Sequence, residues 1–174
     1  MVIWLVGLSG SGKTTIGREI YKLWKPLAPN TVMVDGDDIR KIFGHDKGPN
    51  KYSVEGRRKN AERIVEICHW LDRQEINVVC CILCIFDDIM TNNKKIYSKY
   101  YQVYLDAPIN LLKHRDPKGL YKRAEEGKEK NVVGLDLPFT KPTLSDIGIV
   151  INEDSPEPIV LAEMIMKKAG IISG

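Results

Sequence analysis

The sequence predicts an α/β fold in which a five-stranded parallel sheet carries helices on both faces. Five short apolar runs recur along the chain, and each is continuous rather than alternating, which is typical of strands covered on both faces. Segments with helical spacing of apolar residues separate these runs. Such alternation indicates parallel strands joined by right-handed crossovers. The length of 174 residues suits a single domain that spans residues 1–174.

The strands are expected at the apolar runs, which are residues 2–6, 31–35, 77–85, 100–106 and 147–152. A first helix should end before Pro26, a third should open after Pro108, and the last should start near Pro158. Apolar residues at helical spacing mark one face of the first two helices, and these are Ile16, Ile20, Leu23 and Trp24, then Ala61, Ile64, Val65, Cys68 and Leu71.

Composition and charge indicate a globular protein with a local anionic ligand. The chain is 43% hydrophobic and 28% charged, and its net charge of +3 is too small to imply nucleic acid. Residues 40–63 hold eight Lys or Arg against three Asp or Glu, and residues 113–130 hold seven against four. Two basic segments on a mildly acidic body favour a small anion. A nucleic-acid partner is not expected, because the first segment offers only Phe43 and Tyr52 for stacking.

The apolar runs and the cysteines predict a cytoplasmic protein with no membrane partner. The longest runs are far below the ~20 residues that span a bilayer, and the first has no charged start or cleavage site. Three of the four cysteines lie in one apolar run, where Cys packs as a small hydrophobe. Cys81 and Cys84 match C-x-x-C, but no second pair completes a zinc site, so we expect no metal or redox role there.

A phosphate-binding loop follows the first predicted strand. Residues 7–14 read G-L-S-G-S-G-K-T and fit G-x-x-x-x-G-K-[ST]. The glycines let backbone N–H groups wrap phosphate, and the helix that follows adds positive potential. Lys13 should reach the β- and γ-phosphates, while the Thr14 hydroxyl should ligate Mg²⁺. The predicted ATP-binding residues here are Gly7, Ser9, Gly10, Ser11, Gly12, Lys13, Thr14 and Thr15.

Carboxylates follow the second predicted strand, at the sheet edge where open α/β folds bind ligands. Residues 35–40 read D-G-D-D-I-R. Asp35 and Asp37 are predicted to act with Lys13 in catalysis, by holding Mg²⁺ water and orienting an attacking hydroxyl, and Arg40 could clamp an acceptor phosphate. Asp35 joins Thr14 as a predicted metal-binding residue. The alternative is a polar turn that caps the next helix. No N-K-x-D string occurs, which disfavours a GTPase.

Taken together, these strings resemble the adenylylsulfate kinase family, P-loop kinases that transfer the γ-phosphoryl of ATP to the ribose 3′-hydroxyl of adenosine 5′-phosphosulfate. Residues 35–40 fit the family's D-G-D-N-x-R with Asp38 in place of Asn. Residues 57–63 fit its R-x-x-N-x-x-R helix start. Residues 115–121, R-D-P-K-G-L-Y, are the most specific match. The resemblance implies the P-loop nucleoside-triphosphate kinase fold, with a lid at about residues 115–142.

The resemblance also implies roles for individual residues. Asp37 would be the base or the hydroxyl orienter, and Arg115 and Lys118 would belong to the lid over ATP. Independently of the resemblance, the polar composition of residues 45–54 and 116–142 predicts mobile loops or lids over an edge of the sheet. The residues implied to bind a small nucleotide acceptor are Asp37, Arg40, Tyr52, Arg57, Asn60, Lys130 and Val132.

Departures from the family pattern cluster on the acceptor side. Tyr52-Ser53 stands for a Phe-Ser pair, whereas Val132-Val133 stands for a Phe-Thr pair, so one stacking face worth roughly 1–3 kcal/mol is lost. Residues 84–87 replace I-S-P-(F/Y)-R, and residues 48–50 replace the usual loop before the aromatic. Neutral drift is one explanation, and a changed acceptor is the other. A divergent branch of the family phosphorylates cytidine diphosphoramidate for capsule phosphoramidate groups, and we expect this acceptor slightly ahead of adenosine 5′-phosphosulfate.

A different class of function is an ATP-switched binding module, in which the nucleotide only changes a surface. That reading leaves the carboxylates at 35 and 37 and the basic acceptor segments without a purpose. The sequence leaves open the base of the acceptor, the order of substrate binding and the oligomeric state. A homodimer is one of the oligomeric states that stay open.

Overall fold

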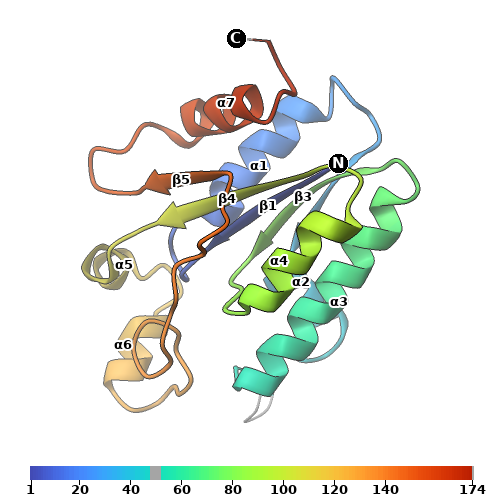
Figure 1. Cartoon of the computed structure of the whole chain (residues 1–174). Coiled ribbons are helices and arrows are strands. Elements are labelled where there is room, and N and C mark those ends of the chain that lie inside the picture. The colour runs from blue at the N-terminus through green and yellow to red at the C-terminus, as the bar shows by residue number, and fades with distance from the viewer. Residues whose placement is uncertain (48–51, 174) are drawn as a thin grey trace.

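Within residues 1–47 and 52–173, which the computed structural model describes, five strands form one parallel sheet in the order β2-β3-β1-β4-β5 (Figure 1). The strands are β1 Val2–Gly7, β2 Thr31–Asp35, β3 Asn77–Ile82, β4 Tyr100–Asp106 and β5 Ile147–Val150. The predicted α/β fold with an all-parallel sheet is confirmed.

Two strands are shorter than the apolar runs that predicted them. In β3, Ile82 is paired with Val6, the residue before the phosphate loop starts to leave the sheet. The residues after Ile82 therefore have no neighbouring strand to continue beside. In the same way, Val150 of β5 pairs with Asp106, the last residue of β4. A strand ends where its partners end, whatever the hydropathy of the residues that follow.

The four predicted helices are present, and the described residues form three further helices that were not predicted. Ser53 caps the longest helix by accepting a hydrogen bond from Gly56 N at 3.1 Å. The helices are α1 Lys13–Trp24, α2 Gly36–Ile42, α3 Val54–Asp72, α4 Asp87–Ile96, α5 Ile109–Arg115, α6 Leu120–Glu125 and α7 Pro158–Lys168. The unpredicted ones are α2, α4 and α6, whose short or strongly polar sequences carry no clear apolar face.

Two hydrophobic clusters cover the two faces of the sheet, as Figure 1 shows with α1 and α7 on one side and α3 and α4 on the other. Strand β1 contributes side chains to both clusters, because successive side chains of a strand point to opposite faces. Ile3 and Leu5 pack with α1 and α7, whereas Trp4 and Val6 pack with α3 and α4. The phosphate loop is therefore mounted on a fully buried central strand.

The four cysteines are buried in these clusters and form no disulfide. Burial raises the pKa of the Cys84 thiol to about 11, and burial likewise raises the pKa of Cys81. Thiols in this state are poor nucleophiles, since the thiolate is the reactive form. In the part of the chain that the structure describes, no helix is long and apolar enough to cross a membrane.

Candidate active site

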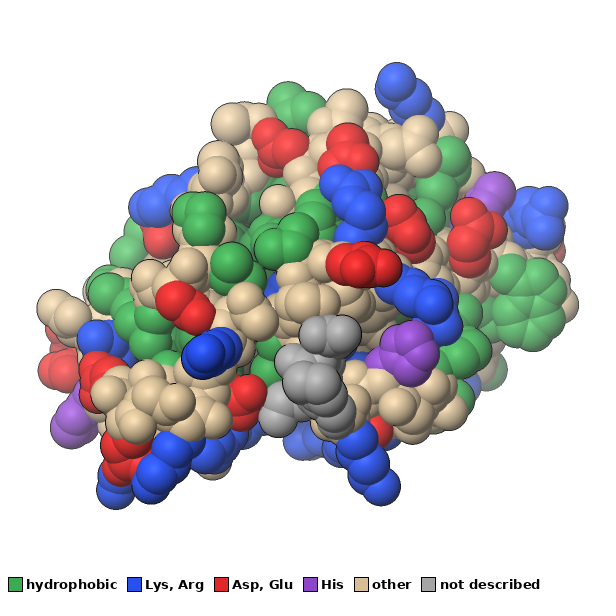
Figure 2. Space-filling view, turned by 90° about the horizontal axis from the view of Figure 1, so that it is seen from below, with side chains coloured by type: hydrophobic (Ala, Val, Ile, Leu, Met, Phe, Trp, Pro, Cys, Tyr) green, Lys and Arg blue, Asp and Glu red, His purple; other side chains and the backbone are tan. Residues whose placement is uncertain are grey.

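A cavity of about 310 Å³ opens at the carboxyl ends of the strands. The predicted ATP side and the predicted acceptor side both contribute to its wall. The lining residues are Ser9, Gly10, Gly12, Lys13, Thr14, Thr15, Asp35, Gly36, Asp37, Arg40, Tyr52, Arg57, Asn60, Cys81, Ile82, Leu83, Pro117, Lys118, Leu120 and Arg123. Five of these side chains are Lys or Arg and two are Asp, so the cavity is net positive. The outer surface seen from below is more mixed, with basic and acidic side chains interspersed (Figure 2).

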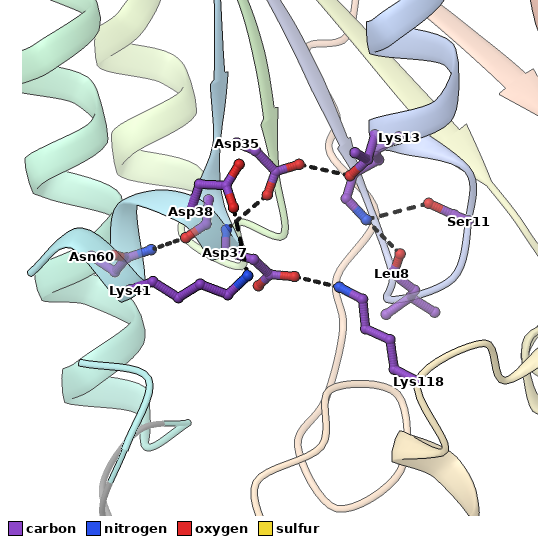
Figure 3. Close-up of polar contacts among 11 residues, drawn as sticks. Leu8, Ser11, Lys13, Asp35, Asp37, Asp38, Lys41, Asn60 and Lys118 are labelled. Carbon is purple, nitrogen blue, oxygen red and sulfur yellow. Dashed lines mark hydrogen bonds and ion pairs between the residues drawn. The ribbon is translucent and has the colours of Figure 1, made fainter. Parts of the chain in front are cut away.

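The phosphate loop has the backbone that its glycines permit. Gly10 and Gly12 have φ of 79° and 94°, a left-handed conformation that other residues rarely adopt. Lys13 Nζ donates to Leu8 O at 2.6 Å and lies 3.5 Å from Ser11 Oγ (Figure 3). Burial lowers the pKa of Lys13 to about 8. The ammonium is thus held by oxygens of its own loop. Phosphate oxygens can replace these oxygens as its partners.

The loop is joined to the end of β2 by a hydrogen bond between Thr14 and Asp35. Thr14 Oγ1 donates to Asp35 Oδ2 at 2.7 Å, and Asp35 Oδ1 accepts from Asp37 N at 2.9 Å. The alternative role of this segment, a cap for the next helix, is therefore also present, because Asp35 caps α2. Two oxygen ligands from different segments suit Mg²⁺, which keeps several waters and phosphate oxygens in its shell.

Asp37 projects from the first turn of α2 toward the phosphate loop and forms an ion pair with Lys118 (Figure 3). Burial alone would raise the pKa of Asp37, but the hydrogen bond and positive charge of Lys118 lower it below the usual value. The carboxylate is therefore ionised at neutral pH, and it can accept a hydrogen bond from a hydroxyl group.

Two buried arginines form the opposite wall. Arg40 and Arg57 are 7% and 8% exposed, and their guanidinium carbons lie 5.5 and 5.3 Å from the centre of the Tyr52 ring. Burial lowers the pKa of Arg57 to about 10. Arg57 donates from Nε to Tyr52 O at 3.0 Å and from Nη2 to Asn131 O at 2.8 Å. It thus ties together two segments that the resemblance places around the acceptor.

Asn60 adds a polar group beside these arginines. Its Nδ2 donates to Gly36 O at 3.2 Å, while its Oδ1 is buried and has no hydrogen-bond partner among the described residues. A buried acceptor without a partner is costly in a native structure. A ligand or a water in the cavity can supply the missing donor.

Some residues of the predicted lid are packed on the phosphate loop. Tyr121 is 1% exposed, and its hydroxyl donates to Ser9 O at 2.8 Å. The carboxylate of Asp116 accepts from the backbone N–H groups of residues 120, 121 and 122 and so caps α6. The segment expected to be a loop is therefore partly helical and docked.

Five predicted site residues are not among the lining residues, and these are Gly7, Ser11, Arg115, Lys130 and Val132. Ser11 is buried in the loop, with its Oγ 3.5 Å from Lys13 Nζ. Gly7 ends β1 beneath the loop, and a Cβ there would come within 2.7 Å of Leu105 O. Arg115 is exposed and donates to Asn152 O at 3.2 Å, and Lys130 is exposed. Val132 is 1% exposed in the core, so its side chain offers almost no surface to an acceptor. Residues 48–50 lie outside the described residues.

Several lining residues were not predicted. Leu83 directly follows the last residue of β3, and Cys81 lies beneath the loop with Sγ 3.3 Å from Lys13 O. Pro117, Leu120 and Arg123 come from the segment that includes Lys118. The basic composition of residues 113–130 was a signal for Arg123, but composition does not indicate which cation faces inward.

Comparison with known proteins agrees with this geometry. The sequence profile of the family described as adenylylsulphate kinase matches residues 1–150. A cytidine diphosphoramidate kinase from Campylobacter jejuni is 35% identical over 171 residues, which cover 98% of this chain and 96% of that protein. An adenylyl-sulfate kinase from Clostridium acetobutylicum is 33% identical over 160 residues, which cover 91% of this chain and 78% of that protein.

Solved structures show the same fold. The Mycobacterium tuberculosis APS kinase CysC, in complex with AMPPNP and APS, superposes with a TM-score of 0.85 at 22% identity, over 97% of this chain and 96% of that one. The predicted P-loop kinase fold and the predicted phosphotransferase are confirmed. The chain belongs to the adenylylsulphate kinase family.

Proposed function

We propose that the chain is an ATP-dependent kinase that transfers the γ-phosphoryl group to the ribose 3′-hydroxyl of an activated nucleotide, with cytidine diphosphoramidate as the favoured acceptor. One observation carries the reaction class. A single cavity holds the phosphate loop on one wall and Asp37 with two buried arginines on the other. The γ-phosphate of the donor and the 3′-hydroxyl of the acceptor can therefore meet at Asp37.

The ATP half consists of the phosphate loop and the oxygens beside it. The backbone of residues 9–15 would wrap the phosphates, with Lys13 on the β- and γ-phosphates. Thr14 and Asp35 would hold Mg²⁺, which supplies charge neutralisation when bound. The 2.7 Å contact between their oxygens supports this pairing. Gly7 would position the loop, and Arg115 remains a prediction on the ATP side.

The acceptor half would place the hydroxyl against Asp37 and the anionic 5′ group against Arg40 and Arg57. Nε and Nη2 of Arg57 already donate hydrogen bonds to backbone carbonyls. The remaining N–H groups of Arg57 are therefore those that can bind an anion. Asn60 and Tyr52 would complete this side. The role of Lys130 in acceptor binding stays a prediction. Val132 can support the acceptor site only by packing beneath the residues that line the cavity.

The reaction would proceed by in-line displacement. The 3′-oxygen forms a bond to the γ-phosphorus as the bond from phosphorus to the β–γ bridging oxygen breaks, and that electron pair leaves with ADP. Asp37 holds the hydroxyl and receives its proton late, when the new bond is nearly complete, because phosphoryl transfer is largely dissociative. Most of the catalysis is then positioning and electrostatic stabilisation.

The name of the Campylobacter relative supports the cytidine acceptor, since that protein matches nearly the full length of the chain. The alternative is an adenylylsulfate kinase that makes 3′-phosphoadenosine 5′-phosphosulfate in sulfate assimilation, which the clostridial relative supports. A single domain with a lid at residues 115–142, a cytoplasmic location and a homodimer are also part of this proposal.

A comparison of acceptors tests the proposed function. We expect kcat/KM to be higher with cytidine diphosphoramidate than with adenosine 5′-phosphosulfate, with ADP release and the 3′-phosphorylated product followed together. The opposite ratio would identify an adenylylsulfate kinase. ATP hydrolysis with no transfer to any nucleotide would instead support the ATP-switched binding module.

Arg57→Ala should raise the KM for the acceptor about tenfold or more, since a charge-assisted hydrogen bond is worth about 1.5–3 kcal/mol. The KM for ATP should change little, because Arg57 lies on the wall opposite the phosphate loop. Arg58→Ala is the matched control, because Arg58 is the next residue on α3 but pairs with Asp88 at the surface. Equal effects of Arg57→Ala on both substrates would contradict its place on the acceptor side.

A further inference from the structure

We propose that Lys118 is a catalytic residue whose ammonium exchanges partners, from Asp37 in the empty site to the γ-phosphoryl group of ATP. The inference rests on the proposed transfer at Asp37. It goes beyond ATP binding by a lid, because it assigns to one lysine both the release of the carboxylate and the neutralisation of the transferred group.

The position of the ammonium is the first observation. Lys118 lies between α5 and α6, whereas Asp37 lies in the first turn of α2, and Figure 3 shows the two side chains meeting across the cavity. The acceptor hydroxyl must touch Asp37, and the γ-phosphorus must lie in line with that hydroxyl. A cation bonded to Asp37 therefore stands beside the place where the new bond forms.

The segment that carries Lys118 lies against the phosphate loop through neighbouring residues. Lys118 O accepts from Arg123 Nη1 at 2.8 Å, and a Cβ built on Gly10 would lie 3.8 Å from Pro117 Cδ. Tyr121, three residues further on, bonds to Ser9 O. The side chain of Lys118 is 62% exposed and has a flexible four-carbon stem. Exchange therefore needs rotation of one side chain and no closure of the segment.

The charges around Asp37 supply the reason for exchange. The ammonium groups of Lys13 and Lys118 and the carboxylate of Asp37 line the same cavity, in which Lys118 pairs with Asp37. An ATP γ-phosphate brings negative charge that both ammonium groups can share. Once Lys118 bonds to phosphate oxygen, Asp37 is free to accept the hydroxyl. During transfer the phosphorus–oxygen bond to ADP breaks as the bond to the 3′-oxygen forms, and the ammonium, which stays protonated, stabilises the charge on the moving group.

Binding of ATP and ADP without any acceptor tests the exchange. Lys118→Met should weaken ATP about tenfold and leave ADP within about threefold, since only ATP carries the γ-phosphate. Lys118→Arg, which retains the charge, should keep most of the preference for ATP. Lys122→Met is the matched control, because its side chain is exposed and does not line the cavity. Equal weakening of ATP and ADP by Lys118→Met would overturn the proposal.

The double variant separates exchange from simple repulsion. Asp37→Asn should tighten ATP binding when Lys118 is present, because the lysine is released, and this gain should disappear in the Lys118→Met background. The same gain in both backgrounds would show that Asp37 merely repels ATP, and the exchange would be rejected. With the acceptor present, kcat of Lys118→Met should fall about a hundredfold. Since the binding measurements use no acceptor, a wrong acceptor leaves their outcome unaffected.

Discussion

Lys13→Ala is expected to abolish phosphoryl transfer, with turnover reduced about a thousandfold or more, while the chain stays folded. The side chain of Lys13 hydrogen-bonds only to Leu8 and Ser11 of its own loop among the described residues, so its loss removes no hydrogen bond between elements of the fold. With ATP bound, the same ammonium would neutralise the β- and γ-phosphates. ADP release and a thermal unfolding curve measure the two effects separately.

Lys22→Ala is the control for this variant, because Lys22 lies exposed on the same helix and pairs with Glu19. It should retain full turnover. Near wild-type turnover of Lys13→Ala would remove the phosphate-loop assignment.

Asp37→Asn should lower kcat by about 10²–10⁴-fold without raising the KM for ATP, because the amide keeps the shape of the group but cannot take the hydroxyl proton. Steady-state kinetics with both substrates varied measure this. Asp38→Asn is the matched control, since its exposed side chain pairs with Lys41 at 3.7 Å and lies outside the cavity lining. A raised KM for ATP with unchanged kcat would show that Asp37 is a binding residue. The roles assigned to Asp35 and Asp37 would then have to be exchanged.

The pH dependence of the wild type follows from the same carboxylate. The pKa of Asp37 is held below its usual value, so the group is charged above that lowered pKa and loses its charge only as the pH falls through it. Between pH 8 and about 5, kcat/KM, which reports the free enzyme, should therefore show no acid limb from Asp37, given an ordinary Asp pKa of about 3.9. Lys118→Met should move the acid limb to higher pH.

The alternation of apolar runs and helical segments was enough to predict the sheet, because buried parallel strands need continuous apolar sequence. It was not enough to predict α4, whose sequence D-D-I-M-T-N-N-K-K-I is mostly polar. That helix is held by Ile89 and Met90, which are buried on the sheet, and by Asn93, which is completely buried. Tertiary packing outweighed local pattern there.

The ATP half of the site could be predicted from local sequence, because a phosphate loop is one contiguous segment. The acceptor half could be predicted only in part, because it is assembled from segments far apart in the chain. The family resemblance indicated Arg40, Arg57 and Asn60, which line the cavity, but local sequence does not show which neighbouring side chains face inward. Val132 illustrates the difference. Its place in a motif indicated a pocket wall, yet its backbone N–H bonds to Asp136 and its side chain enters the core. The direction of one side chain in a loop depends on contacts that the motif does not contain.

The strand order gives the two halves of the site unequal resistance to local opening. Strand β1, which carries the phosphate loop, lies between β3 and β4, so its amide hydrogens exchange with solvent only when the sheet itself opens. Strand β2, which ends at Asp35 and leads into α2, is at the edge and has a neighbour on one side. Substitutions around Arg40 therefore disturb a helix that follows an edge strand, and we expect local opening there to cost less free energy than opening of β1. The acceptor side can then diverge in sequence while the phosphate loop keeps the stability of the whole domain.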